Sequence, residues 1–331
     1  MQTFQELLRK YLGTLVGVHA GDSIGAPYET MRPREIARDI EARGGLVFFD
    51  YKNPWPNDGN GVDLPAGRPT DDSEQTAVLA FSLLRNNGLC IEDLHTLLRH
   101  NVIDRKSLLW EGLSTGSGQT TRDALSDNPK LVAKALSNSM GTNGSLMRCS
   151  PMALWFGPPQ LGWTDETSMR SMVFRMSKVT HAHPHALQAC WMYTAVLLKL
   201  LAGYSPAEAI FNSILVYSDP RYELFYRRVT ASVSDDYLIP YDPGAFPGRG
   251  LAEFSLFVAL YALKHATSFR DGIEIAVRVG GDTDTYAAIA GGLLGAHFGY
   301  GGIPEEWRRT ILGHNKMCIY AEQILKKRMG K

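Results

Sequence analysis

Helical periodicity is the feature that most restricts what this chain can fold into. Apolar residues recur at intervals of three and four almost throughout, and only residues 45–51 alternate as a short strand would. Gly and Pro cluster between the helical stretches, and no fixed repeat or low-complexity linker divides the chain. The pattern predicts a single all-α domain over residues 1–331. The expected helices lie at about 3–20, 33–43, 71–87, 91–100, 119–126, 130–137, 145–157, 168–181, 185–202, 206–217, 221–233, 249–266, 270–278, 284–298 and 304–326.

The composition limits the classes of protein to which this chain could belong. Lys plus Arg and Asp plus Glu both number 34, so the net charge favours neither nucleic acid nor an anionic membrane. The four cysteines form no CxxC pair, which indicates free thiols and a cytoplasmic protein. The N-terminal stretch is typical of an amphipathic helix rather than a signal peptide. The most apolar window, residues 186–204, is interrupted by Gln188 and Lys199, so a buried helix is favoured over a membrane span. We expect a monomer without a membrane partner.

Two short acidic segments stand out, and each follows a Gly/Pro-rich stretch and leads directly into a helical one. Their oxygen-bearing side chains are Thr70, Asp71, Asp72, Asp282, Asp284 and Thr285. If the two helix starts meet in the fold, four carboxylates share one small volume, and only protons or cations can neutralise them. Oxygen donors alone favour a hard cation such as Mg²⁺ or Mn²⁺ over Zn²⁺. The sequence therefore indicates a site for two divalent cations.

Ordinary helix capping is the alternative for both segments. Thr70 or Asp71 could cap the helix, and Asp71 with Glu74 has the spacing of a capping box. Residues 281–285 fit this alternative less well, because a cap needs one side-chain oxygen and this turn offers four.

Three further segments carry weaker signals. Residues 21–29 contain Asp22 and Glu29 among glycines and Pro27, and they could simply end the first helix and turn the chain. The Gly-rich residues 112–121 could face a phosphate with backbone amides, but they match neither a Walker loop nor a Rossmann fingerprint. Residues 141–145 form a similar turn, for which an ordinary N-cap is the alternative.

Two features concern the neighbourhood of these segments. The alternating histidines His181, His183 and His185 could chelate zinc, but no further ligand lies at a recognised spacing, so a site rim or a helix-to-helix turn is favoured. The helix expected at 284–298 carries a face of Gly and Ala. Because small residues let a neighbouring helix approach closely, we expect this helix to lie centrally.

Six segments in this order resemble the ADP-ribosylglycohydrolase family. They read GDSIGAPYE, GRPTDDSEQT, GLSTGSGQTTRDAL, GTNGSLMRCSPMAL, THAHPHA and GGDTDTYAAIAGGLLGA. The resemblance covers residues 11–299 and implies a compact orthogonal helical bundle with a di-metal cleft. It also implies hydrolysis of the glycosidic bond at C1″ of ADP-ribose, with ADP-ribosylated protein as the partner and two Mg²⁺ or Mn²⁺ as cofactors.

The resemblance also assigns roles to residues. The implied metal ligands are Thr70, Asp71, Asp72, Asp282, Asp284 and Thr285. The implied catalytic residues are Glu29, Asp71, Asp72 and Asp284, where Glu29 matches a mobile acidic residue of the family. The implied substrate-binding residues are Gly116 and Gly118 at the diphosphate, Asn143, Gly144 and Ser145 in a second loop, and His181 at the distal ribose. Which carboxylate acts as the general acid is left open.

The family pattern and this sequence differ in two places. Thr142 and Ser145 stand where small Gly or Ala residues are common, and the span between Glu29 and Thr70 is lengthened. We expect residues 44–69 of that span to lack regular structure and Trp55 either to pack on the domain or to close over the substrate. An arginine-linked acceptor is favoured over serine. A hydrolase of a small ADP-ribose ester or nucleotide, and a non-catalytic ADP-ribose-binding or crystallin-like relative, are the alternatives.

Overall fold

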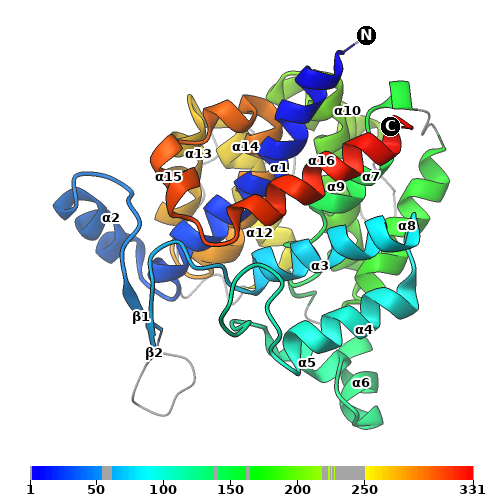
Figure 1. Ribbon diagram of the computed structural model, residues 1–331, viewed down its shortest axis with the longest axis horizontal. Coiled ribbons are helices and arrows are strands. Elements are labelled where there is room, and N and C mark those ends of the chain that lie inside the picture. Colours follow the sequence, from blue (N-terminus) through cyan, green and yellow to red (C-terminus); the bar gives the residue numbers. More distant parts are fainter. Residues whose placement is uncertain are drawn as a thin grey trace.

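The computed structural model confirms that the chain is all-α (Figure 1). It describes residues 2–53, 62–137, 141–161, 165–217, 223, 225, 227 and 250–330. The helices in these ranges are α1 (Phe4–Gly25), α2 (Pro33–Ala42), α3 (Asp71–Asn86), α4 (Ile91–Val102), α5 (Gln119–Ala124), α6 (Pro129–Leu136), α7 (Ser150–Phe156), α8 (Glu166–Lys178), α9 (Pro184–Ala202), α10 (Pro206–Tyr217), α12 (Ala252–His265), α13 (Phe269–Arg278), α14 (Thr283–Phe298), α15 (Glu305–Thr310) and α16 (His314–Arg328). Shorter elements are the 3₁₀ turns η1 (Ala26–Tyr28), η2 (Pro159–Leu161) and η4 (Tyr300–Gly302), and the strands β1 (Tyr51–Asn53) and β2 (Val62–Leu64).

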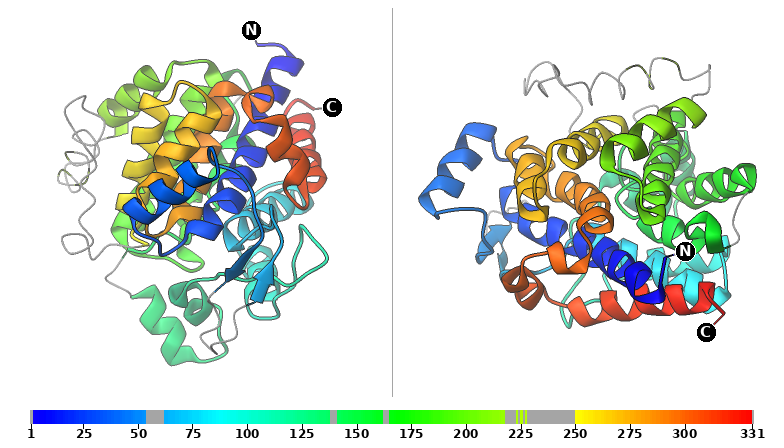
Figure 2. Two further views of the ribbon diagram at one scale, coloured as in Figure 1. Left: turned by 90° about the vertical axis from the view of Figure 1, so that its left-hand side faces the viewer. Right: turned by 90° about the horizontal axis from the view of Figure 1, so that it is seen from above.

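Helices α1 and α14 run antiparallel with their backbones in contact (Figures 1 and 2). A Cβ added to Gly17 would lie 2.2 Å from the Gly291 carbonyl oxygen, and a Cβ added to Gly291 would lie 2.1 Å from that of Gly17. Only residues without side chains permit such an approach. The facing pairs are Gly13 with Gly295, Gly17 with Gly291, Gly21 with Ala287 and Gly25 with Thr283, and we call this contact the glycine seam. The expected central position and close neighbour of the helix at 284–298 are thus confirmed.

The other helices cover this pair. Helix α16 packs across α1 and also contacts α3 and α7, while α9, α12 and α13 pack against α14 (Figure 1). Helix α9 is buried along nearly all of its length, which confirms that the apolar window at 186–204 is a core helix. None of the helices in the described ranges is both long and apolar enough to cross a membrane.

The first helix does not end near residue 20, as the glycines had suggested, but continues to Gly25. Gly21 and Gly25 face α14 within the glycine seam, so their lack of a side chain serves close packing rather than a turn. Each glycine inside a helix costs about 1 kcal/mol relative to Ala, and the packing of α14 offsets that cost.

Two other predicted helices differ from the structure. The helix expected at 145–157 begins only at Ser150. Residues before it form tight turns, because the Asn143 carbonyl accepts hydrogen bonds from the amides of Leu146 (2.8 Å) and Met147 (3.0 Å). The helix expected at 304–326 is divided into α15 and α16, where Gly313 has a φ of +87° that a continuous helix does not allow.

The strand expected at 45–51 is wrong, and a small hairpin follows it instead. Strand β1 begins at Tyr51 and pairs antiparallel with β2, with Tyr51 opposite Leu64. The segment 44–69 therefore contains regular structure that we did not expect. Trp55 and the rest of residues 54–61 lie outside the described residues, as does most of the predicted helix at 221–233. The lid hypothesis for Trp55 stays a prediction.

Candidate active site

Asp22 of α1 holds the start of α3. Its carboxylate is fully buried and accepts hydrogen bonds from the Thr70 hydroxyl (2.7 Å), the Thr70 amide (3.0 Å) and the Ser73 amide (3.0 Å), and also from the Ser73 hydroxyl. Asp22 therefore satisfies backbone donors that a helix start leaves without partners. Sequence reasoning had taken Asp22 for a turn or capping residue of its own segment; it is inside α1 and caps a different helix.

Thr70 caps α3 as the capping alternative proposed, because its Oγ1 accepts the Asp72 amide at 3.5 Å. The same hydroxyl oxygen lies 3.1 Å from Oδ2 of Asp72. The proposed capping box does not form. Glu74 instead turns away and accepts hydrogen bonds from the Leu108 amide (2.8 Å) and from the Ser107 hydroxyl.

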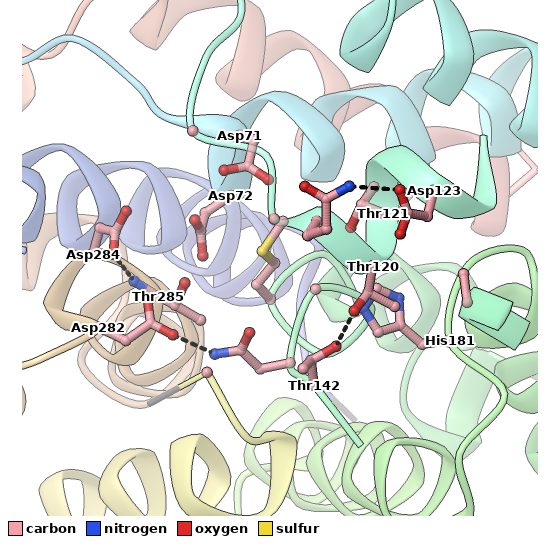
Figure 3. Close-up of a pocket in the computed structure, with 18 of the residues that line it drawn as sticks. Asp71, Asp72, Thr120, Thr121, Asp123, Thr142, His181, Asp282, Asp284 and Thr285 are labelled. Atoms are coloured by element: carbon pink, nitrogen blue, oxygen red, sulfur yellow. Dashed lines mark hydrogen bonds between the residues drawn. The ribbon is translucent and has the colours of Figure 1, made fainter. Parts of the chain in front are cut away.

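The second acidic segment begins α14 at the end of the glycine seam. Asp282 precedes the helix, and its Oδ2 accepts a hydrogen bond from the Asn143 amide group at 2.8 Å. Asp284 lies in the first turn, and its Oδ1 accepts the Thr285 amide at 2.9 Å. Thus the two acidic segments, which are far apart in the sequence, meet as expected (Figure 3).

The loop after η1 brings Glu29 to the same place. Two backbone hydrogen bonds join this loop to the turn before α14: the Thr30 amide donates to the Gly281 carbonyl (2.6 Å), and the Gly281 amide donates to the Met31 carbonyl (3.1 Å). Both Thr30 and Gly281 have positive φ, +71° and +86°, so the pairing fixes an unusual backbone shape. Glu29 is consequently held beside Asp282.

The carboxylates form two overlapping groups. Oxygen atoms of Asp22, Asp72 and Asp284 lie within 4.8 Å of one another, and so do those of Glu29, Asp282 and Asp284. Asp284 belongs to both groups. No histidine or cysteine of the described residues belongs to either group.

Burial and mutual repulsion perturb the ionisation of these groups. Burial first, and then the charges of Asp282 and Asp22, together raise the pKa of Glu29 to about 7. The pKa values of Asp71, Asp72 and Asp284 are raised well above their usual range, first by burial and then by neighbouring carboxylates. Asp72 Oδ1 is buried and has no hydrogen bond of ordinary geometry within the described residues. A centre of this kind attracts a cation.

A cavity of about 880 Å³ opens from the carboxylates (Figure 3). Asp71, Asp72, Asp282 and Asp284 lie at one end, and Thr120, Thr142 and His181 lie at the other. It is lined by Glu29, Thr30, Asp71, Asp72, Gly116, Gly118, Gln119, Thr120, Thr121, Asp123, Lys134, Ala135, Ser137, Thr142, Asn143, Gly144, Met147, His181, Gly250, Gly281, Asp282, Asp284 and Thr285. The volume lies in the usual range for small-molecule and cofactor sites.

The Gly-rich segment before α5 contributes Gly116 and Gly118 to the cavity lining. Gly116 has a φ of +104°, and a Cβ there would come within 2.8 Å of Asp71 Oδ1. Gly118 precedes α5, and a Cβ there would meet nothing within 4 Å. A substitution at Gly116 therefore disturbs Asp71 directly, whereas one at Gly118 enters open cavity.

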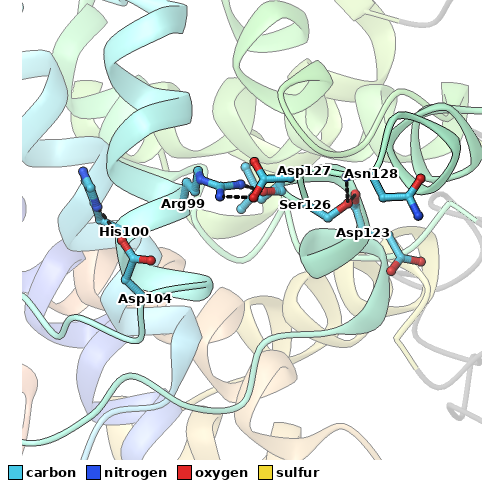
Figure 4. Close-up of polar contacts among 8 residues, drawn as sticks. Arg99, His100, Asp104, Asp123, Ser126, Asp127 and Asn128 are labelled. Carbon is cyan, nitrogen blue, oxygen red and sulfur yellow. Dashed lines mark hydrogen bonds and ion pairs between the residues drawn. The ribbon is translucent and has the colours of Figure 1, made fainter.

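A polar network outside the cavity holds α5 in place (Figure 4). Arg99 of α4 donates hydrogen bonds to the Leu125 carbonyl (2.6 Å) at the end of α5 and to the Asp127 carboxylate (2.7 Å). The Ser126 hydroxyl donates to the Asp123 carbonyl at 2.9 Å. These contacts fix the helix whose first residues line the cavity.

The second predicted substrate loop divides between the cavity and the interior. Asn143 and Gly144 line the cavity, and a Cβ on Gly144 would meet the His181 ring at 2.8 Å. Ser145 is fully buried behind them, where its hydroxyl oxygen lies 2.8 Å from the hydroxyl oxygen of Ser177. Neither Ser145 nor Thr70 is among the lining residues. A substrate contact through the Ser145 side chain stays a prediction without support from this geometry.

The three alternating histidines point to different partners. His181 lines the cavity, His183 accepts the His185 amide (3.2 Å) at the start of α9, and His185 pairs with Glu253 (3.0 Å). This arrangement agrees with the rim and turn interpretation rather than with zinc chelation.

Sequence reasoning overlooked Arg148 and Gln75 as well as the position of Asp22. Arg148 is fully buried between the two ends of the cavity and donates to Gln75 Oε1 at 2.7 Å, and Gln75 in turn donates to Asp71 Oδ2 at 2.7 Å. The sequence does contain a signal for the position of Asp22. Asp22 directly follows Gly21, and Gly21 belongs to the series of glycines at four-residue spacing in α1 that faces α14.

Fold and site together define an all-α protein with a buried carboxylate centre at one end of a ligand-sized cavity. The sequence model of the ADP-ribosylglycohydrolase family matches residues 3–331. The chain therefore belongs to the ADP-ribosylglycohydrolase family, which confirms the resemblance seen in the sequence.

Individual relatives agree with this assignment. The chain is 26% identical to the ADP-ribosylarginine hydrolase Tri1 of Serratia proteamaculans, over 96% of this chain and 80% of the relative. It is 24% identical to the ADP-ribosyl-[dinitrogen reductase] glycohydrolase of Rhodospirillum rubrum, over 89% and 88% of the two chains. A solved structure described as an ADP-ribosylglycohydrolase-related protein complex superposes with a TM-score of 0.74 and 26% identity, covering 98% of this chain and all of the other. These names support a glycohydrolase.

Proposed function

We propose that this protein is a metal-dependent ADP-ribosyl hydrolase that cleaves the glycosidic bond between C1″ of ADP-ribose and a modified protein side chain. The observation that carries the proposal is the shared position of Asp284. It belongs to both carboxylate groups, and both lie at one end of the cavity. Two cation positions joined by a shared carboxylate are the arrangement that such a donor set suits.

The residues fit hard divalent cations, and Mg²⁺ or Mn²⁺ is proposed. Every candidate donor is oxygen, Asp72 Oδ1 is buried without an ordinary hydrogen bond, and the raised pKa values show that the carboxylates crowd one another. The proposed ligands are the predicted set Thr70, Asp71, Asp72, Asp282, Asp284 and Thr285, with Asp22 added. When bound, the cations supply positive charge that neutralises the carboxylates, and they fix ribose hydroxyls next to the reacting carbon.

Glu29 is the proposed proton-transfer group. Its side chain lines the cavity beside Asp282 and Asp284, and in the metal-free protein burial and the neighbouring carboxylates raise its pKa to about 7. Cleavage at C1″ develops positive charge on the ribose ring, which the neighbouring carboxylates stabilise, and the leaving group needs a proton. Gly116 and Gly118 are proposed to receive the diphosphate, and His181 the distal ribose.

The acceptor is proposed to be arginine. One relative acts on ADP-ribosylarginine by name, and a second is named for dinitrogen reductase. A relative named ADP-ribosylhydrolase ARH3, from Bos taurus, is 23% identical over 96% of this chain, and its name specifies no acceptor. All predicted carboxylates are present here, which disfavours a non-catalytic relative.

The test is an activity screen on defined substrates. ADP-ribosyl-arginine, ADP-ribosyl-serine and O-acetyl-ADP-ribose are incubated with EDTA-treated protein, with and without added Mg²⁺ or Mn²⁺. We expect turnover of the arginine conjugate only with metal. Asp71→Asn and Asp284→Asn should each lower the rate by orders of magnitude while the helical circular dichroism is unchanged. Full activity of the metal-free protein contradicts the metal role, and exclusive turnover of the acetyl ester contradicts the proposed acceptor.

A further inference from the structure

Arg148 is a buried cation that connects the two ends of the cavity from behind. It lies in the turn before α7 and is 0% exposed. Its Nη1 donates to Gln75 Oε1 (2.7 Å) and to the Gly144 carbonyl (3.0 Å), and its Nη2 donates to the Thr180 hydroxyl (2.6 Å). None of these partners is charged, so Arg148 is held without a directly bonded carboxylate among the described residues. A buried charge held in this way is costly and therefore needs a reason.

Arginine can only donate hydrogen bonds, and this fixes the groups beside it. Toward the carboxylates, the Gln75 side chain must present its oxygen to Arg148. Its NH₂ group is then turned to Asp71 Oδ2, 2.7 Å away. Arg148 thereby makes Gln75 a donor to Oδ2 of Asp71.

The same argument applies toward His181. The Thr180 hydroxyl has one proton, and it accepts a hydrogen bond from Arg148, so its own proton is available for Nδ1 of His181 at 2.7 Å. Among the described residues Nδ1 is the acceptor within reach of this proton, so the hydroxyl donates to Nδ1, and the proton of the neutral ring resides on Nε2. Burial and the charge of Arg148 lower the pKa of His181 to about 3, so the ring is neutral.

We propose that Arg148 is a positioning residue that sets the tautomer of His181 through Thr180, so that His181 presents an Nε2–H donor at the cavity. The consequence concerns the ligand: the group that meets His181 must be a hydrogen-bond acceptor, such as a hydroxyl or phosphate oxygen. This consequence rests on the proposed function, whereas the tautomer does not.

The first measurement reads the tautomer without any ligand. Long-range ¹H–¹⁵N spectra of protein labelled at histidine distinguish Nε2–H from Nδ1–H, and His181→Gln identifies the signal of His181. We expect the Nε2–H form in the parent protein. Thr180→Val removes the hydroxyl while nearly keeping the shape, and it should give a mixture of the two forms. Arg148→Met should do the same, and Arg148→Lys should restore the Nε2–H form at least in part.

Ser177→Ala is the matched control. The Ser177 hydroxyl is buried in the same region and donates to the His181 carbonyl (2.9 Å) rather than to its ring, so the tautomer should not change. If Arg148→Met fails to fold, the smaller change Arg148→Lys tests the Arg148 step, and Thr180→Val tests the Thr180 step. An Nδ1–H form in the parent, or an unchanged Nε2–H form in Thr180→Val, overturns the proposal.

The second measurement is ADP-ribose binding by calorimetry. A misdirected His181 leaves a buried polar group without its partner, so Thr180→Val should raise the Kd about ten- to hundredfold. If the parent protein does not bind ADP-ribose, the proposed function fails. The role of Arg148 is then decided by the spectra alone. An unchanged Kd together with a changed tautomer overturns the donor role of His181 toward the ligand.

Discussion

Replacing Asp22 with Asn should weaken metal binding about one hundredfold and leave the metal-free fold nearly unchanged. Oδ2 of Asp22 accepts both backbone amides, from Thr70 (3.0 Å) and Ser73 (3.0 Å), so the Asn oxygen at this position keeps both hydrogen bonds. The new NH₂ group then takes the place of Oδ1 and can donate to the Thr70 hydroxyl, which turns its own proton to Asp72 Oδ2, 3.1 Å away. No buried backbone donor loses its partner.

The free energies of this change nearly cancel in the metal-free protein. Hydrogen bonds to a carboxylate are about twice as strong as neutral ones, so their loss costs about 1–2 kcal/mol. The loss of the Asp22 charge relieves repulsion, because that charge helps to raise the pKa values of Asp71, Asp72 and Asp284. We expect a net change in the free energy of unfolding of within about 1 kcal/mol.

Added metal is expected to stabilise the parent protein more than the Asp22→Asn variant. A ligand at about one hundred times its Kd stabilises a fold by about 2.7 kcal/mol. A chain of 331 residues unfolds with an entropy of about 0.7 kcal/mol per kelvin, so saturating Mg²⁺ should raise the Tm by about 4 °C. If Asp22→Asn weakens binding about one hundredfold, the same Mg²⁺ concentration adds only about 0.4 kcal/mol, or less than about 1 °C.

The assay is calorimetric unfolding of EDTA-treated, dialysed protein with and without Mg²⁺. Glu74→Gln is the matched control, because Glu74 is a buried carboxylate of α3, the helix that Asp22 caps, has its own donors and belongs to neither carboxylate group. Its Mg²⁺-induced Tm shift should equal that of the parent. Equal shifts in the parent and in Asp22→Asn would refute the ligand role, and a metal-free loss of more than about 3 kcal/mol would assign Asp22 to the fold alone.

Three further predictions follow from the same geometry. The pKa of Glu29 is about 7 in the folded protein, against an ordinary value of 4.5. Between about pH 4.5 and pH 7 the folded state therefore binds more protons than the unfolded state. The free energy of unfolding of the metal-free protein should fall by on the order of 1–3 kcal/mol as the pH rises across this range. Glu29→Gln should flatten this pH dependence in calorimetry, and an unchanged slope contradicts the assignment. Gly291→Ala places a Cβ 2.1 Å from the Gly17 carbonyl oxygen. The cost of overpacking, about 1–3 kcal/mol, should outweigh the gain in helix propensity of about 1 kcal/mol, so the Tm should fall. Gly301→Ala, whose added Cβ meets open space, should not lower the Tm. Gly118→Val should raise the Kd for ADP-ribose at least about tenfold at an unchanged Tm, and an unchanged Kd by calorimetry would remove this loop from the diphosphate site.

The sequence allowed prediction of most helices, because periodicity and capping are local signals. The meeting of the two acidic segments was implied by the family resemblance, since no local signal joins segments so far apart in the chain. It misled us at Gly21 and Gly25, where the local preference of glycine for turns was overridden by packing against α14. The four-residue repeat of glycines in α1 could have shown this, since its spacing matches one face of a helix.

Arg148 could not have been predicted in the same way. Its partners Gln75 and Thr180 come from segments 73 and 32 residues away. A buried arginine between neutral partners has no pattern in the local sequence. Such a contact is set by the tertiary arrangement alone.

The glycine seam also indicates at which stage the carboxylate centre is assembled. The seam ends at Gly25 and Thr283, beside Asp22 and Asp284, and its contacts are between backbone atoms that have no rotamers to change. The separation of the two backbone positions that carry these carboxylates is therefore set by helix geometry before any cation arrives. Folding, rather than ligand binding, therefore brings the carboxylates together against their mutual repulsion. The metal-free protein is thus a preorganised receptor in which the carboxylates already repel one another.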